Sequence, residues 1–132
     1  MALIADEANI SREGKLNVLG VFDRIISANF PMVHPKMVLV FRIEAEFGDN
    51  GRPIPVRVRL LDEEGAPLFE AGGEIVAPMV EPGDFATTHQ VFGLFGTQFE
   101  RPGSYRFVVN LGDLPPHETP LMILRAPWPK AN

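Results

Sequence analysis

Three histidines, His34, His89 and His117, have the side chains in this sequence best suited to metal binding or acid–base catalysis. A strand brings two ligands to one face when they are an even number of residues apart, yet no His-x-His or His-x-x-x-His spacing occurs. His117 and Glu118 are neighbours and would point to opposite sides of a strand. We interpret His34 and His117 as loop residues beside prolines and His89 as a strand residue. The alternative is a small metal-dependent hydrolase, or a ligand-binding sandwich, that uses His89, His117 and a carboxylate.

Other signatures of catalysis or ligand binding are missing from the sequence. The serines stand outside any Gly-x-Ser-x-Gly turn, and there is no cysteine to act as a nucleophile or a thiolate ligand. Carboxylates cluster at turns, as at residues 62–64, without the Asp-x-Asp spacing that is typical of calcium loops. We therefore expect no cofactor and no metal, and a non-enzymatic role is the preferred hypothesis.

The composition sets further limits on the function. The chain has 132 residues, of which 45% are hydrophobic, and a net charge of −5 without a basic cluster. Nucleic acids and anionic membranes are bound through such clusters, so neither partner is expected. Asp6 and Glu7 interrupt the first apolar stretch, and the longest unbroken apolar run, Met37–Phe41, is far too short to span a bilayer. These features predict a single-domain cytoplasmic protein.

Glycine and proline predict an all-β protein. Twelve glycines and thirteen prolines interrupt the chain so often that few segments could form a helix. The longest central segment without either residue, Lys36–Phe47, alternates between apolar and mostly polar side chains with period two, which is typical of a half-buried strand. Its apolar side consists of Met37, Leu39, Phe41, Ile43, Ala45 and Phe47.

Residues 54–61 alternate in the same way after a turn-rich stretch, and we predict that they form an antiparallel hairpin with the preceding strand. One register that matches the two apolar faces would place two arginines opposite each other. The other places Glu44 opposite Arg59 and Glu46 opposite Arg57. We choose the second register because opposite charges across a strand pair stabilise it and like charges do not.

The spacing of turns predicts the architecture. About eight strands with frequent turns indicate an antiparallel β-sandwich, immunoglobulin-like or jelly-roll-like, with a small β-barrel as the alternative. The domain would cover residues 1–126, and residues 127–132 would form a proline-rich tail. The segment 87–99 is apolar on both faces, which predicts either a central strand or large side chains packed on Gly93 and Gly96. The other strands are expected at residues 2–6, 16–26, 68–76, 104–111 and 121–126.

Three glycines and one tyrosine are expected to have structural roles. Gly14 lies in a short turn where a left-handed backbone is expected, and Gly20 interrupts a strand, where glycine usually marks a bulge or a close approach. In FERPGSYRF, residues 99–107, the pair Gly103 and Tyr105 resembles the tyrosine corner of immunoglobulin-like sandwiches. In such a corner the hydroxyl forms a hydrogen bond with the backbone a few residues upstream.

The segment ALIADEANISREGKLNVLGVFDRI at residues 2–25, followed by PMVHPKMVLVFRIE at residues 31–44, resembles a family of small bacterial proteins of unknown function. The resemblance implies one β-sandwich domain over the length of the chain. It implies no activity, cofactor or catalytic residue. Within these segments Gly14, Gly20 and Asp23 would be its structural signature residues.

These observations favour a non-enzymatic interaction or structural module. Val38, Val40, Leu61 and Val108 fall on the otherwise polar faces of their strands. They predict an exposed apolar patch where a protein partner, or a second copy in a homo-oligomer, could dock. Trp128 is a further candidate for this interface, although packing back on the sandwich is the preferred interpretation.

Overall fold

A computed structural model describes residues 2–127 of the chain. Over these residues it has nine β-strands and one short 3-10 helix, and no helix is long and apolar enough to cross a membrane. The elements are β1 (Ala2–Ile10), β2 (Leu16–Val21), β3 (Arg24–Ser27), β4 (Met32–Glu46), η1 (Phe47–Asp49), β5 (Pro53–Leu61), β6 (Pro67–Val76), β7 (Phe85–Phe99), β8 (Gly103–Leu111) and β9 (His117–Arg125).

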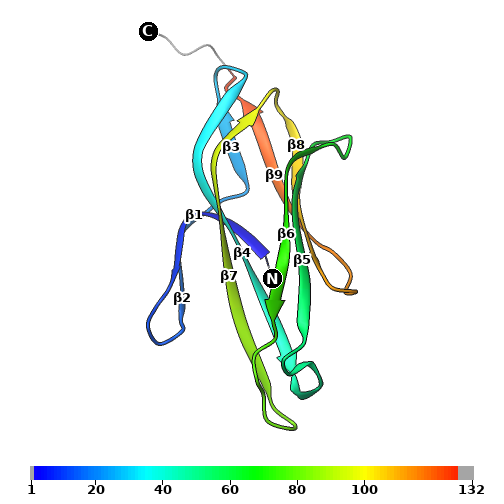
Figure 1. Ribbon diagram of the computed structural model, residues 1–132. Helices are drawn as coiled ribbons and strands as arrows, with labels where there is room; N and C mark the ends of the chain where they lie inside the picture. The colour runs from blue at the N-terminus through cyan, green and yellow to red at the C-terminus, as the bar shows by residue number, and fades with distance from the viewer. Residues whose placement is uncertain (1, 128–132) are drawn as a thin grey trace.

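The strands form two sheets that lie against each other (Figure 1). The four-stranded sheet has the order β2–β1–β4–β7, and the five-stranded sheet has the order β3–β9–β8–β5–β6. Both sheets are open at their ends, so the predicted all-β sandwich is confirmed and the alternative of a closed barrel is wrong. The pairings between these strands are antiparallel except that of β3 with β9, which is parallel.

The core lies between the two sheets and follows the predicted alternation of β4, except that Phe47, which was expected on the inward side, lies in η1 and is exposed. Met37, Leu39 and Phe41 point inward from β4, and their side chains are buried. Leu60 and Phe107 belong to the same apolar cluster and come from the five-stranded sheet. Burial of each such side chain contributes about 1.5–3 kcal/mol. The period-two pattern therefore determines which face of the sheet turns inward.

The predicted hairpin between residues 36–47 and 54–61 is wrong. β4 pairs with β1 and β7, whereas β5 pairs with β6 and β8 in the other sheet. The chain crosses from one sheet to the other after η1, so the apolar faces of β4 and β5 meet across the core and do not lie side by side. Arg57 forms its ion pair with Glu70 of β6 and not with Glu46. Alternation identifies the apolar face of a strand, but it does not identify the neighbouring strand.

The tyrosine corner is formed as the motif predicts. The Tyr105 hydroxyl donates a hydrogen bond to the backbone carbonyl of Arg101 at 2.7 Å. The side chain is buried, and its ring packs edge-on against Phe99 with the centroids 5.0 Å apart. Burial raises the pKa of Tyr105 above its ordinary value of 10.0. The corner thus joins the end of β7 to the start of β8.

The glycines expected to be structural occupy positions where a side chain would not fit or would be strained. Gly14 has a φ of +85° in the β1–β2 turn. Gly20 has a φ of +72°, and a Cβ there would clash with the carboxylate of Asp6, so the close approach is present while the strand register continues without a bulge. A Cβ on Gly103 would lie 2.9 Å from Oε1 of Glu63. The same oxygen accepts a hydrogen bond at 2.7 Å from the backbone N–H of Ser104, at the start of β8.

Candidate functional site

The three histidines are distributed over both sheets. His34 lies in β4 and His89 in β7, in the four-stranded sheet, whereas His117 begins β9 in the other. His34 and His117 are therefore strand residues and not the loop residues that the sequence suggested. The ring of His34 packs beside Phe22, with the centroids 5.9 Å apart. Among residues 2–127, no three His, Asp or Glu side chains are grouped closely enough to hold a metal ion.

The apolar patch expected on the outer faces of the strands is not exposed. Val38 and Val40 are buried, because the apolar side chains of the β1–β2 hairpin pack against them on the outer face of β4. Leu61 and Val108 are buried in the other sheet, where Val108 lies between charged residues of β5 and β9. The expectation of an exposed patch at these four residues is wrong. Trp128 lies outside the described residues.

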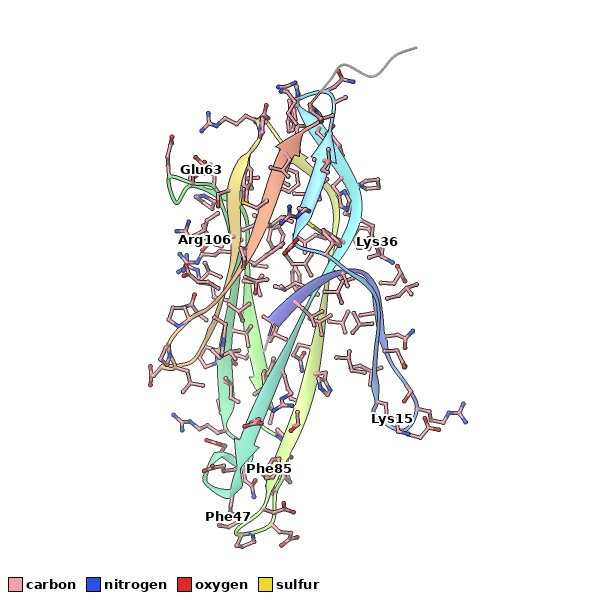
Figure 2. All side chains as sticks on the ribbon, turned by 180° about the vertical axis from the view of Figure 1, so that it is seen from behind. Lys15, Lys36, Phe47, Glu63, Phe85 and Arg106 are labelled. Atoms are coloured by element: carbon pink, nitrogen blue, oxygen red, sulfur yellow. The ribbon has the colours of Figure 1, made fainter. Side chains whose placement is uncertain are left out.

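Exposed apolar side chains lie instead along β7. This strand lies at one end of the four-stranded sheet (Figure 1). Its fifteen residues include neither a charged residue nor a proline. Phe85, Val91 and Phe95 expose 64%, 37% and 73% of their surface. Phe85 lies at the same end of the molecule as the exposed Phe47 (Figure 2). An end strand presents unpaired backbone N–H and C=O groups along its outer side, and β7 combines these groups with exposed apolar side chains.

The three other end strands have features that discourage the addition of a further strand. β6 begins with Pro67 and carries Glu70 and Glu74. β3 has four residues, and β2 has six residues that include Gly20 in a left-handed conformation. Over the described part of the chain, β7 is therefore the end strand best suited to pair with another strand.

The side chain of Phe95 is held against β7 by two contacts. Its ring lies over Gly93, where a Cβ would come within 3.2 Å of the ring. The ammonium group of Lys36 lies 5.9 Å from the centre of the ring on the β4 side. This confirms that a large side chain packs on a glycine of this strand, whereas the alternative of a central strand is wrong because β7 ends its sheet.

The side-chain alternation of β7 breaks at Gly96, which has a φ of +64°, although the pairing with β4 continues to Phe99. Leu94 and Phe99 are both buried although they are five positions apart along the strand, so the inward face changes between these two positions. Before this change, the exposed residues of the strand all occupy odd positions, although His89 is only partly exposed. The regular outer edge therefore extends over residues 85–95.

A cavity of about 190 Å³ opens between β7 and β6. Its lining is mainly apolar, and the backbone of Gly72 and Gly73 forms part of the wall on the β6 side. Gln90 of β7 contributes a polar side chain to the lining. The ring of Phe69 packs against Phe92 at 5.5 Å between centroids and connects the two end strands. Small-molecule sites usually measure about 300–1,000 Å³, so this cavity is smaller than such a site usually is.

A family of unknown function, DUF6941, matches residues 1–124. The chain belongs to this family. The resemblance to a family of unknown function is thus confirmed, while a bacterial origin of this DUF6941 protein stays a prediction. No curated protein and no solved structure matches the chain. Membership of DUF6941 assigns no activity to the chain.

Sequence reasoning did not identify the edge of β7 in this DUF6941 protein. The signal was present, because residues 85–99 form the longest strand without a charged residue or a proline. It becomes meaningful only once the order of the strands is known, since an uncharged central strand is ordinary and an uncharged end strand is not. Phe85 and Phe95 are the residues that this signal would have selected.

Proposed function

We propose that this protein is a non-enzymatic, cytoplasmic interaction module that binds its protein partner by adding a strand to the outer edge of β7. The single observation that carries the proposal is an end strand of fifteen residues without charge or proline. Soluble proteins usually protect such edges with lysine, proline, bulges or a covering element. An edge left without these features is suited to pairing with another strand.

The geometry around β7 supports strand addition in two ways. An added strand satisfies the unpaired backbone groups of β7, and each such hydrogen bond contributes about 0.5–1.5 kcal/mol net. Alternate side chains of that strand would then face the cavity between β7 and β6, and the others would contact Val91 and Phe95 on the outer face. Backbone pairing supplies affinity, while the cavity and the exposed rings supply specificity.

Site-specific photo-crosslinking in the native host tests the proposal. Benzoylphenylalanine in place of Phe95 on β7 is compared with the same group in place of Leu68, which is also exposed but lies on the end strand β6. We expect a crosslinked protein product from the β7 position and none from the β6 position. The product should disappear when Val91→Lys is added, because a lysine on the edge blocks pairing.

Equal crosslinking from the two positions, or none from β7, would contradict strand addition at this edge. The competing hypothesis, a metal-dependent hydrolase that uses His89 and His117, makes a different prediction. Stoichiometric zinc, iron or manganese in the purified protein would favour it.

A further inference from the structure

We infer that the strand added to β7 is β7 of a second copy of this chain, paired antiparallel in a register centred on Gln90. The inference rests on the proposed function and names its partner. A two-fold axis perpendicular to the sheet at Gln90 would join the four-stranded sheets of two copies into one continuous sheet. Such an axis keeps the inner faces of both copies on the same side, so residues that lie opposite each other share a face.

Charge favours β7 over β6 for pairing with itself. In a symmetric antiparallel pair, each residue lies opposite a residue equally far from the axis on the other copy. For β6, the register centred on Gly72 would set Glu70 opposite Glu74 twice, and like charges directly opposite are destabilising. β7 has no charged residue between Phe85 and Phe99, so no register of β7 with itself opposes like charges.

The extent of the regular edge selects the register. All exposed residues within 85–95 occupy odd positions before the left-handed Gly96, and Gln90 is the middle of this stretch. A pair centred on Gln90 therefore uses the whole regular edge. It places Phe85 of each copy opposite Phe95 of the other on the outer face, and these are the two most exposed large apolar side chains of the strand. Aromatic pairs across strands stabilise a sheet, and this register forms two of them.

The inner face is compatible with the same register. Gln90 meets Gln90 of the second copy at the axis, where each amide can donate one hydrogen bond and accept one. The small Ala86 lies opposite Leu94, and Thr88 lies opposite Phe92. Gln90 and Phe92 also line the cavity between β7 and β6, so the added strand would cover the mouth of that cavity with its own inner side chains.

Disulfide trapping tests the register directly, since the chain has no cysteine of its own. Residues directly opposite in an antiparallel pair have Cα atoms about 4.5–5.5 Å apart, within disulfide reach. Under mild oxidation we expect Gln90→Cys to form a covalent dimer. Thr88→Cys lies on the same face but should stay monomeric. Its cysteine and that of the second copy would be about four residues, or ~13 Å, apart along the strands. An equimolar mixture of His89→Cys and Val91→Cys should form the mixed dimer.

A dimer yield at least tenfold higher for Gln90→Cys than for Thr88→Cys, together with the mixed dimer of the second pair, supports the inference. Equal trapping of Gln90→Cys and Thr88→Cys, or no trapping of either pair in folded protein, overturns it. Failure of this inference can be distinguished from failure of the proposed function. If photo-crosslinking at Phe95 captures a different protein while Gln90→Cys stays monomeric, strand addition stands and the second copy is excluded as the occupant.

Discussion

Removal of one oxygen atom tests the tyrosine corner. Tyr105→Phe keeps the buried ring and its edge-on contact with Phe99 but removes the 2.7 Å hydrogen bond to the carbonyl of Arg101. The loss of one net hydrogen bond between neutral groups lowers the free energy of unfolding by about 1 kcal/mol. For a chain of this length that corresponds to a decrease of about 4 °C in the unfolding midpoint, which calorimetry or thermal circular dichroism would measure.

The same variant makes a prediction at alkaline pH. Because burial raises the pKa of Tyr105 above 10.0 in the folded protein, the folded state holds this proton to higher pH than the unfolded state does. The resulting stability is fully present below pH 10.0 and is lost as the pH rises through the folded-state pKa. Wild-type protein should therefore lose stability over this range, and Tyr105→Phe should lack this component of the loss.

The titration can be observed directly, because Tyr105 is the one tyrosine in the chain. Tyrosinate absorbance in the native protein should rise with a midpoint above the ordinary value of 10.0. A native midpoint at or below that value would refute the reasoning, and so would identical thermal unfolding of wild type and Tyr105→Phe. Binding through β7 should be unchanged in the variant, since the hydroxyl lies in the corner and not on the edge.

Three further substitutions test other parts of the structure. Gly20→Ala should lower the free energy of unfolding by about 1–2 kcal/mol because of left-handed strain, and by more because the added Cβ clashes with Asp6. Gly14→Ala should show the strain alone, since no atom lies within 4 Å of a Cβ at that position. Equal losses for the two variants in denaturant titrations would argue against the clash. Glu63→Ala removes the acceptor at the start of β8 and should cost about 1 kcal/mol in the same assay, and an unchanged midpoint would contradict that role. Val91→Lys on β7 should weaken self-association roughly tenfold or more in light scattering, while Val76→Lys on β6 should leave it unchanged. Equal effects of the two variants would show that self-association is not specific to the edge of β7.

Much of the fold followed from side-chain alternation and chain breakers. The pattern of Lys36–Phe47 identified the inward face of β4, and Met37, Leu39 and Phe41 are buried there. The spacing of Gly103 and Tyr105 identified the corner, because the motif is local and its hydrogen bond spans four residues. Predictions of this kind succeed when the interaction lies within a few residues of the motif.

Predictions that depended on distant contacts were less reliable. The pattern of β4 was compatible with a neighbour in the same sheet or a partner across the core, and the second is the case. Val38 and Val40 fell on an outer face, but the β1–β2 hairpin covers them. The open edge of β7 could not be identified for the same reason. Its apolar residues have the composition of a central strand, and only the order of the strands places them at an end.

Hydrogen–deuterium exchange at low and high protein concentration is the most direct test of the claim that β7 is the edge where this protein pairs with a second copy. Raising the concentration should slow exchange of the outward amides of residues 85–95 and leave those of β6 unchanged, because a new strand protects only the edge it joins. Exchange in β7 that is independent of concentration, or slowing that is equal in β6 and β7, would contradict the claim.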